Sequence, residues 1–341
     1  MADGKDLVPL PLPGGPQLGL RTNAELIARG RAEAYSLTLQ AVPSCLARAK
    51  QNGKWGFIDK PGRFAIAPIF DCVGDFCEGL ARASVGGKYE SGYIDKLGKF
   101  VVEPRFHEAG SFVEGLATVT IYHDDCEECE WGYLNRKTLK YAREGWCDDG
   151  IYESIRAAEK NEHSPHEGLR PVCSGWDYGY QDQNGRWVIE PQFGMAGHFS
   201  ESLAPVRVND LWGVIDENAN FVVEPYYQMI YEFSEGLAAF RLDDKYGFID
   251  TIGRRTIDAR FDDYGWQFDQ GQACVGIGCL YGIIDRLGKF VTIPQFQKVG
   301  LFRKDLARIQ GTNEKWGFID RKGNLVIDLQ FEDAGSFHSI G

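Results

Sequence analysis

One five-residue pattern occurs eight times along the chain, and this repetition constrains the fold more than any other feature. The pattern is an aromatic residue, glycine, an apolar residue, isoleucine and aspartate, as in Trp55-Gly56-Phe57-Ile58-Asp59. The glycines of successive copies are 34 to 47 residues apart, and the later copies begin at Ser91, Trp131, Tyr178, Trp212, Tyr246, Tyr281 and Trp316. A period of this length is typical of folds that stack one small structural unit many times.

The residues that follow the aspartate predict a turn. Gly62 stands three residues after Asp59, and six copies keep this Asp-x-x-Gly spacing, whereas Thr138 and Ala219 replace the glycine in the other two. Apolar runs of strand length flank the turn on both sides. We therefore predict a β-hairpin in which the aspartate caps the turn and the glycine supplies a positive φ.

Each unit is predicted to contain three strands. The strand after the turn ends in Pro-x-aromatic, as in Pro68 to Phe70, and proline is expected at a strand end or a sheet edge because it lacks an N–H. An acidic-Gly-Leu-Ala step, such as Glu78 to Ala81, starts the third strand. Glycine after the signature aromatic would permit a bulge or close packing of a neighbouring ring. One unit cannot bury its aromatic face alone, so neighbouring units must stack.

These motifs resemble the bacterial WG, or KWG, repeat. The resemblance rests on the Trp-Gly-x-Ile-Asp-x-x-Gly hairpin, the Pro-x-Phe ending and the Glu-Gly-Leu-Ala step, and it covers roughly residues 45–341. The second copy departs from it with Ser91 in place of tryptophan, and the third copy lacks the Pro-x-Phe ending. The resemblance implies an all-β tandem array of about eight three-stranded repeats. The family carries no established catalytic residues, so none is assigned here.

Two arrangements of the array are consistent with its ends. Cys45-Leu46-Ala47 resembles Gly79-Leu80-Ala81, and the last copy stops after Phe337, where such a strand should follow. We favour an open superhelix, or solenoid, of eight whole units that each begin at the Leu-Ala strand. The alternative is a closed, propeller-like ring in which the N-terminal strand completes the last unit. That alternative requires Ala47 to lie close to Phe337.

Two segments fall outside the repeat pattern. Residues 1–44 combine a Pro/Gly-rich extended arm with one helix from Asn23 to Leu39, which we expect to cap the array. Docking of a partner is the alternative role of that helix. Residues 136–168 form an insert between the third and fourth copies. Inserts in repeat proteins often carry binding, and an inert loop is the competing interpretation.

The charge balance limits the classes of partner. Lys and Arg total 37 and Asp and Glu total 49, which gives a formal net charge of −12. An acidic surface disfavours nucleic acid, whose phosphates need cations, and it suits a basic protein. No apolar run reaches the roughly 18 residues of a membrane span, and the first residues lack the features of a signal peptide. With nine cysteines, an odd number, we expect a cytoplasmic protein with reduced thiols.

The strongest signal for a metal site is the Cys-x2-Cys pair of Cys126 and Cys129. Cys147 and His163 would complete a tetrahedral zinc site, with His166 as another possible fourth ligand. No second Cys-x2-Cys pair is present, and acidic residues crowd the loop. We therefore favour inert thiols on an exposed loop and no cofactor, and keep zinc as the alternative.

The recurring aromatic, glycine and aspartate residues are interpreted as structural. One aromatic residue per repeat indicates core lining, with a stacking platform for sugars or bases as the alternative. The aspartates occupy turn-capping positions, which argues against a catalytic array of carboxylates. The positions assigned this structural role are Trp55, Gly56, Asp59, Gly62, Trp131, Trp212, Tyr246, Tyr281, Trp316, Gly317 and Asp320.

These features favour a non-enzymatic scaffold that binds another protein through a concave or edge surface. Repeat surfaces bind through many shallow contacts, and the sequence has no serine-nucleophile elbow, P-loop or dinucleotide fingerprint. A more specific alternative is an immunity-type protein that neutralises a basic toxin. The rival class is a metal-dependent enzyme centred on residues 121–168, and a carbohydrate-binding module is a third option.

Overall fold

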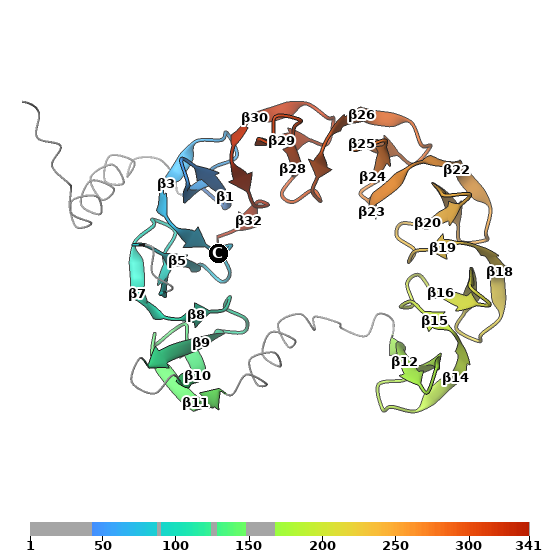
Figure 1. Ribbon diagram of the computed structural model, residues 1–341, viewed down its shortest axis with the longest axis horizontal. Helices are drawn as coiled ribbons and strands as arrows, with labels where there is room; N and C mark the ends of the chain where they lie inside the picture. The colour runs from blue at the N-terminus through green and yellow to red at the C-terminus, as the bar shows by residue number, and fades with distance from the viewer. Residues whose placement is uncertain (1–42, 87–89, 124–127, 148–167, 341) are drawn as a thin grey trace, which may run out of the picture. The chain divides into compact units, whose positions relative to one another are not determined.

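The computed structural model describes residues 43–86, 90–123, 128–147 and 168–340, where the elements are the β-strands β1 to β32 (Figure 1). The all-β expectation is confirmed. None of the described residues belongs to a helix that is long and apolar enough to cross a membrane. The chain divides into two compact units, Met1–Ala41 and Val42–Gly341. The predicted arm and helix of residues 1–44 therefore lie almost wholly outside the described residues.

Four kinds of strand recur in chain order. A short first strand follows the Pro-x-aromatic ending: β4 (Cys72–Val73), β8 (Glu108–Ala109), β15 (Met195–Ala196), β19 (Met229–Ile230), β27 (Lys298–Val299), β31 (Asp333–Ala334) and the longer β23 (Asp263–Asp269). The second strand holds the Leu-Ala step or its equivalent: β1 (Cys45–Gln51), β5 (Ala81–Ser84), β9 (Leu116–His123), β12 (Arg170–Ser174), β16 (Leu203–Val208), β20 (Leu237–Leu242), β24 (Gln272–Ile277) and β28 (Leu306–Gln310).

The remaining two kinds form the hairpin around the aspartate turn. The third strand carries the aromatic-Gly pattern: β2 (Lys54–Ile58), β6 (Ser91–Ile94), β10 (Glu128–Asn135), β13 (Asp177–Gln181), β17 (Leu211–Asp216), β21 (Lys245–Asp250), β25 (Leu280–Asp285) and β29 (Trp316–Asp320). The fourth strand follows the turn: β3 (Phe64–Phe70), β7 (Phe100–Phe106), β11 (Tyr141–Cys147), β14 (Trp187–Phe193), β18 (Phe221–Tyr227), β22 (Arg255–Phe261), β26 (Phe290–Phe296) and β30 (Leu325–Phe331). One further strand, β32 (His338–Ser339), ends the described chain.

The strands form eight small antiparallel sheets, each named here after its third strand. Six sheets hold four strands in the order first, second, third, fourth, so that the first and fourth strands are the two edges. The β13 sheet has three strands in the described part of the chain. The three strands predicted per unit were incomplete, because a first strand of two residues is too short to show the alternating pattern that identifies a strand.

The third repeat contains more regular structure than its sequence suggested. β11 is the fourth strand of the β10 sheet and pairs with β10 from Leu134↔Tyr141 to Cys129↔Cys147. No proline is present in β11, which is why the sequence pattern appeared to end before it. The first part of the predicted insert, residues 136–147, therefore belongs to the sheet. Residues 148–167 lie outside the described residues.

The aspartate turns join the third and fourth strands. Asp216 Oδ1 accepts hydrogen bonds from the backbone N–H groups of Asn218 (2.9 Å) and Asn220 (2.8 Å). The glycine of the Asp-x-x-Gly step has a positive φ, as at Gly253 (80°), where residues with a Cβ are disfavoured. The carboxylate and the glycine thus fix the sharp reversal between two strands.

Two turns lack this glycine, and another residue adopts the positive φ. Ala219 adopts the same conformation with a φ of 64°. In the third copy the positive φ is on Leu139 (52°) and not on Thr138. That turn contains one more residue, because the Asn135 N–H bonds to the Lys140 carbonyl, whereas the Asp turns close four residues on.

The glycine after the signature aromatic is required by the backbone of the fourth strand. A Cβ built on Gly213 would lie 2.5 Å from the Val223 carbonyl oxygen and 2.9 Å from the Pro225 nitrogen. The register of β17 and β18 shifts at this point, which marks a bulge. Seven copies share this contact with the fourth strand: Gly56, Gly92, Gly179, Gly213, Gly247, Gly282 and Gly317. The expected close packing is thus against backbone, not against a ring, and proline fits there because the bulge needs no N–H from it.

The Glu-Gly-Leu step is a tight turn between the first and second strands. Glu78 (φ 49°) and Gly79 (φ 84°) both have positive φ, as a type I′ hairpin turn requires. The Glu78 carboxylate also accepts a hydrogen bond from the Gly115 N–H in the next sheet (3.1 Å). The same link joins Glu201 to Gly236 (2.9 Å), so the acidic residue of one turn holds the turn of its neighbour.

Buried side chains join the sheets into one continuous row. Seven hydrophobic clusters each contain residues of two successive sheets, in the order β13, β17, β21, β25, β29, β2, β6 and β10. The described residues contain no such cluster between the β10 and β13 sheets. The core therefore lies between sheets, and no sheet has a core of its own.

A recurring ring pair forms the centre of these clusters. The Phe57 ring in the β2 sheet lies 4.8 Å, centroid to centroid, from Phe76 of the β6 sheet. Tyr93 and Phe112, Tyr180 and Phe199, Phe248 and Phe268, and Phe318 and Phe337 repeat the contact at 4.7 to 5.0 Å. Burial of each ring contributes roughly 2 kcal/mol, and each ring pair adds about 1 kcal/mol beyond that.

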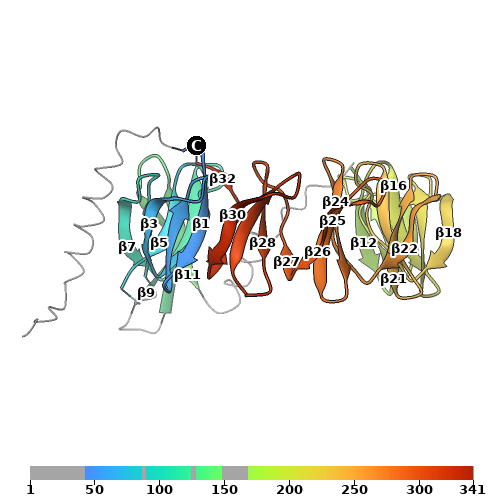
Figure 2. The same cartoon turned by 90° about the horizontal axis from the view of Figure 1, so that it is seen from above.

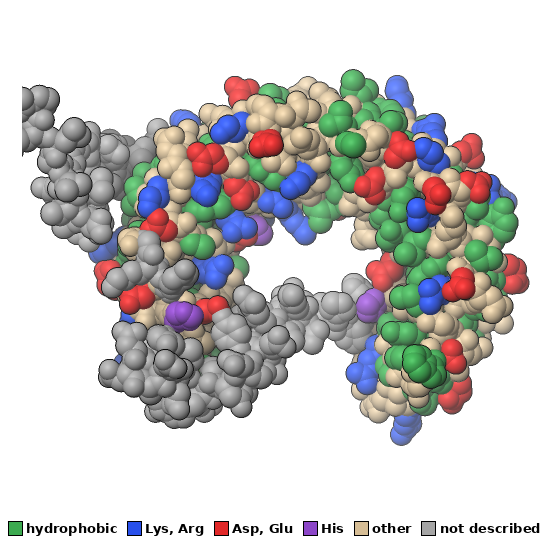
Figure 3. Space-filling model, in the orientation of Figure 1, with side chains coloured by type: hydrophobic (Ala, Val, Ile, Leu, Met, Phe, Trp, Pro, Cys, Tyr) green, Lys and Arg blue, Asp and Glu red, His purple; other side chains and the backbone are tan. Residues whose placement is uncertain are grey.

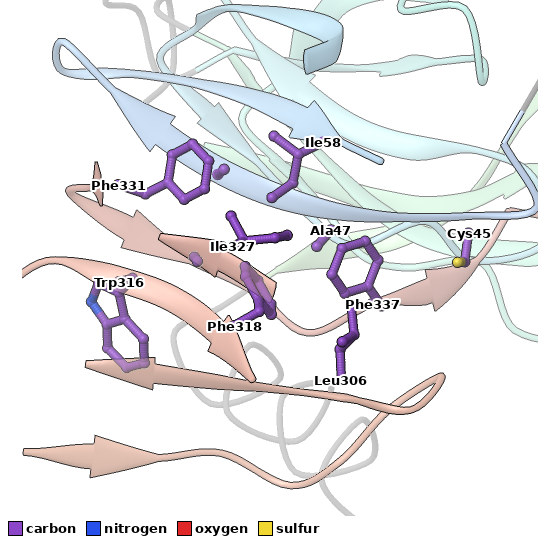
Figure 4. Close-up of a cluster of buried hydrophobic side chains, with 11 residues drawn as sticks. Cys45, Ala47, Ile58, Leu306, Trp316, Phe318, Ile327, Phe331 and Phe337 are labelled. Atoms are coloured by element: carbon purple, nitrogen blue, oxygen red, sulfur yellow. The ribbon is translucent and has the colours of Figure 1, made fainter. Parts of the chain in front are cut away.

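The N-terminal strand belongs to the sheet of the last repeat. β1 pairs antiparallel with β31 through Ala49↔Ala334 and with β32 through Leu46↔His338. Figure 2 shows β1, β30 and β32 side by side. Ala47 and Phe337 lie in one buried cluster between the β2 and β29 sheets (Figure 4).

This pairing corrects the arrangement favoured from the sequence. An open array of self-contained units would leave β1 without partners from the C-terminal end of the chain. Instead, the first strand of the β2 sheet comes from the last repeat, as the alternative arrangement required. The first and last described strands, β1 and β32, meet in the middle of the row of sheets, and the ends of the row are the β10 and β13 sheets.

Replacement of the repeat glycine tests the role of the backbone contact. Gly213→Ala places a Cβ against the fourth-strand backbone, so we expect a loss of about 3 kcal/mol in the free energy of unfolding, measured by urea denaturation. Gly271→Ala is the control, because no atom lies within 4 Å of its added Cβ and only its φ of 78° is strained. That control should lose about 1 to 2 kcal/mol. Equal losses in the two variants would show that the backbone contact is not what selects glycine.

Candidate functional site

The signature aromatic residues have ring faces that are occupied within the chain. Trp212 and Trp316 are only 8% exposed, and Trp55, Trp131, Tyr246 and Tyr281 are half-buried. The guanidinium carbon of Arg308 lies 5.1 Å from the Trp316 ring centroid, and that of Arg48 lies 5.5 Å from the Trp55 centroid. The chain's own cations therefore occupy two of the ring faces that a sugar or base would need.

The turn carboxylates are each bound within their own turn. Asp59 Oδ2 accepts hydrogen bonds from Arg63 Nη2 (2.9 Å) and Nε (3.1 Å). At Asp216, hydrogen bonds from the Asn220 side chain and then from backbone N–H groups hold the pKa of the carboxyl below its usual range. Asp320 makes the corresponding contacts with Asn324. These carboxylates stabilise turns and do not converge on a common site.

The structure brings two of the four candidate zinc ligands into register. Cys129 and Cys147 are directly opposite each other on β10 and β11. Cys126 and His163 lie outside the described residues. Within the described ranges, no group of three or more His, Cys, Asp or Glu side chains is arranged to hold a metal. The zinc site of the 121–168 segment stays a prediction.

The described cysteines differ sharply in environment. Cys72, Cys173 and Cys279 are exposed, whereas Cys274 is buried in the second strand of the β25 sheet. Burial first, and then the nearby Asp263 carboxylate, raise the pKa of the Cys274 thiol to about 12. At neutral pH this thiol is protonated and packs as a small apolar side chain.

The fourth strands present the most regular exposed surface in the described chain. Their third and seventh residues point into the core, as at Val102 and Phe106 of β7, while the second, fourth and sixth point outward. In four of them, β7, β14, β18 and β30, a valine at the second position is followed by a carboxylate at the fourth, as in Val101 and Glu103. This fourth-strand surface comprises Val101, Glu103, Val188, Glu190, Val222, Glu224, Tyr226, Asp258, Ile293, Val326 and Asp328, all of them exposed, and the sixth position adds the exposed cations Arg105 and Arg260.

The five carboxylates of this surface are not neutralised by the protein itself. Glu103, Glu190, Glu224, Asp258 and Asp328 form no ion pair with another residue that the structure describes. Figure 3 shows acidic, basic and apolar side chains along the outer rim of the row. The combination of exposed valines and unpaired carboxylates occurs on the β6, β13, β17 and β29 sheets.

Proline limits how a partner can use this edge. An edge strand exposes backbone N–H and C=O groups that could pair with a strand of another chain. Pro68, Pro104, Pro191, Pro225 and Pro294 remove one donor near the end of five of these strands. Contact through side chains is therefore favoured over strand addition along the full edge.

The signature residues of the repeats alone did not predict this surface. Its signal was present in the sequence, because the residue before the Pro-x-aromatic ending is acidic in Glu103, Glu190 and Glu224. Asp258 and Asp328 keep the acidic residue where alanine and leucine replace the proline. Strand alternation places that residue outward in every sheet that carries it.

Comparison with known families decides the membership of the chain. The model of the WG containing repeat matches residues 55–89, 92–121, 178–212, 212–246, 281–316 and 316–339, which together exceed half of the 341 residues. The chain belongs to the WG repeat family. The two copies that begin at Trp131 and Tyr246 lie almost entirely outside the matched ranges, and the WG-repeat sheets β10 and β21 show that both nevertheless fold as repeats.

Solved structures share only general features with this WG-repeat protein. The chain is similar to a eukaryotic initiation factor, with 11% identity, a TM-score of 0.38 and coverage of 84% of this chain and 85% of that chain. The β-propeller domain of the trilobed protease from Pyrococcus furiosus, described as having an open velcro topology, is 8% identical, with a TM-score of 0.32 and coverage of 84% and 95%. BamB from Moraxella catarrhalis is 10% identical, with a TM-score of 0.31 and coverage of 77% and 92%. No curated protein sequence matches the chain. At these scores no functional inference is transferred.

Thiol labelling tests the burial of the WG-repeat core. At pH 8.5, iodoacetamide should modify Cys72, Cys173 and Cys279 in the native protein, because their side chains are exposed. Cys274 should react only after unfolding, since a pKa near 12 lowers its thiolate fraction by about a thousandfold. Peptide mass spectrometry of the alkylated protein measures each site. Native labelling of Cys274 at the rate of Cys173 would contradict the described packing of the β25 sheet.

Proposed function

We propose that this WG-repeat chain is a non-enzymatic scaffold that binds another protein of basic character. Its eight sheets act as blades of a propeller-like array, and the pairing of β1 with β31 supports that arrangement. The observation that carries the proposal is the fourth-strand surface, where exposed valines and unpaired carboxylates recur on the β6, β13, β17 and β29 sheets. A basic partner with scattered apolar side chains is complementary to this surface.

The rigid links between sheets favour this function. Glu78, Glu201 and Glu235 each bind the backbone of the neighbouring sheet, so adjacent fourth strands keep a fixed spacing. A surface that is fixed before binding loses little conformational entropy when a partner docks. Several weak contacts on successive sheets can then add to a useful affinity.

The side chains of this surface are suited to binding another protein. Each contact pairs a partner cation with an exposed carboxylate and an apolar group with a valine, and each exposed ion pair contributes about 0.2 to 1 kcal/mol. Such contacts raise the association rate and weaken as salt screens them. The proposal therefore includes a strong dependence of binding on ionic strength.

Neutralisation of carboxylates on three consecutive sheets tests the proposal. The partner is first isolated from an extract of the source organism on the immobilised full-length chain, identified by mass spectrometry and purified. Its affinity is then measured by isothermal titration calorimetry with the Glu190→Gln/Glu224→Gln/Asp258→Asn variant. We expect the dissociation constant to rise about tenfold, because three ion pairs are lost.

A matched variant controls for the change in net charge. Glu90→Gln/Asp177→Asn/Glu217→Gln removes the same number of exposed carboxylates away from the fourth-strand surface. It should bind like the unmodified protein. If the two variants weaken binding equally, or if a purified partner binds the first variant as tightly as the unmodified chain, the fourth-strand surface is not the binding site.

A further inference from the structure

Three arginines occupy one position of the second strand in three consecutive sheets. Arg308 lies on β28, Arg48 on β1 and Arg82 on β5, each directly after the Leu-Ala step. They are far apart in the sequence, but the pairing of β1 with β31 makes the β29, β2 and β6 sheets neighbours. They form the arginine row, which lies on the second strands, two strands away from the fourth strands.

Each arginine reaches the first strand of the following sheet. Arg308 Nη1 donates a hydrogen bond to the Ala334 carbonyl (2.7 Å) and Arg48 Nη1 to the Val73 carbonyl (3.3 Å). Arg82 Nη1 donates to the Ala109 carbonyl (3.3 Å). These bonds hold the three guanidinium groups in equivalent orientations before any ligand is present.

Aromatic and glycine residues complete the support of the row. Trp316 and Trp55 lie under the Arg308 and Arg48 guanidinium groups, at 5.1 and 5.5 Å from the ring centroids. The stems of Arg308, Arg48 and Arg82 pass directly over glycine, and a Cβ there would lie 2.6 to 2.8 Å from each arginine Cγ. The glycines are Gly300, Gly335 and Gly74. The five other sheets carry Thr118, Pro171, Pro205, Ala239 and Cys274 at the arginine position, so the row is limited to these three sheets.

The row is only partly neutralised. Arg308 Nε is buried without a hydrogen-bond partner among the described atoms. Arg308 and Arg82 form no ion pair with any carboxylate in the described part of the chain. Arg48 Nε lies 3.3 Å from Asp75 Oδ1, a carboxylate that is also 3.6 Å from His338 Nε2.

The row places three cations close together in a chain with a net charge of −12. Some other arginines are neutralised by carboxylates, as in Arg63 with Asp59 (2.9 Å) and Arg321 with Asp269 (3.2 Å). Two lysines add positive charge next to the row. Lys298 lies over Trp316 and Lys50 lies over Trp55, each at about 6 Å from the ring centroid. Figure 3 shows Lys and Arg side chains gathered where β28, β1 and β5 lie.

We propose that the arginine row binds an extended acidic segment of a second protein. Guanidinium groups bind carboxylates through two parallel hydrogen bonds, and groups that are already oriented lose little entropy. Packed sheets are roughly 10 Å apart and an extended chain advances about 3.3 Å per residue, so carboxylates three residues apart meet successive arginines. The protein then has two surfaces of opposite charge on different strands of its sheets, which allows one scaffold to hold two different partners.

The test uses a labelled peptide with the sequence Glu-Gly-Ser-Glu-Gly-Ser-Glu and fluorescence anisotropy at 50 mM salt. We expect millimolar or tighter binding to the full chain, a loss of at least tenfold in Arg308→Gln/Arg48→Gln/Arg82→Gln and a loss of about threefold in Arg82→Gln. A Gln-for-Glu version of the peptide should not bind. Because Arg82 is exposed, Arg82→Gln should fold, and it tests the proposal if the triple variant fails to fold.

The control variant is Arg105→Gln/Arg186→Gln/Arg254→Gln, which removes three exposed cations from outside the row. It should bind the peptide like the unmodified protein. The proposal is overturned if the acidic peptide does not bind, if Arg82→Gln and the control have equal effects, or if inorganic phosphate or an oligonucleotide binds the row more tightly than the peptide. The outcome is independent of the fourth-strand surface, since no residue is shared between the two.

Discussion

Contact between rings of neighbouring sheets is the interaction on which the rest of the structure depends. Each sheet has at most five strands and cannot bury an apolar face alone, so its stability comes from the sheets beside it. The pair formed by Phe57 and Phe76 shows the geometry, with one ring from the third strand and one from the segment after the first strand of the next sheet. Turns, bulges and links between sheets serve to present these rings in register.

The same constraint explains why β1 pairs with the last repeat. The β29 sheet has an apolar face containing Phe318, and it needs the residues around Phe337 and β1 to cover it. Exchange of a strand between the first and last repeats supplies that cover. It also brings Arg308, Arg48 and Arg82 into one row, which no single segment of the chain could provide.

Much of one repeat could be predicted from the sequence, but the relations between repeats could not. Asp216 and Gly253 act locally, so their spacing was sufficient to identify the turns. The first strands were missed because two residues show no periodicity, and the emphasis on Trp55 overlooked that Phe57 makes the closer contact between sheets. Of the candidate sites, Glu103 and its four equivalents could be identified from the sequence of their own copies. The arginine row depends on which sheets are neighbours, and that order follows from long-range pairing.

Native-state hydrogen exchange tests most directly that β1 is part of the last repeat and that ring contacts between sheets hold it there. Residues 45–51 and 316–339 should exchange slowly and through the same opening in the unmodified protein. Phe337→Ala should lower the free energy of opening of both segments by about 3 to 5 kcal/mol. The protection of the β17 sheet against exchange should not change. Rapid exchange of residues 45–51 in the unmodified protein, or protection there that Phe337→Ala leaves unchanged, would contradict the account.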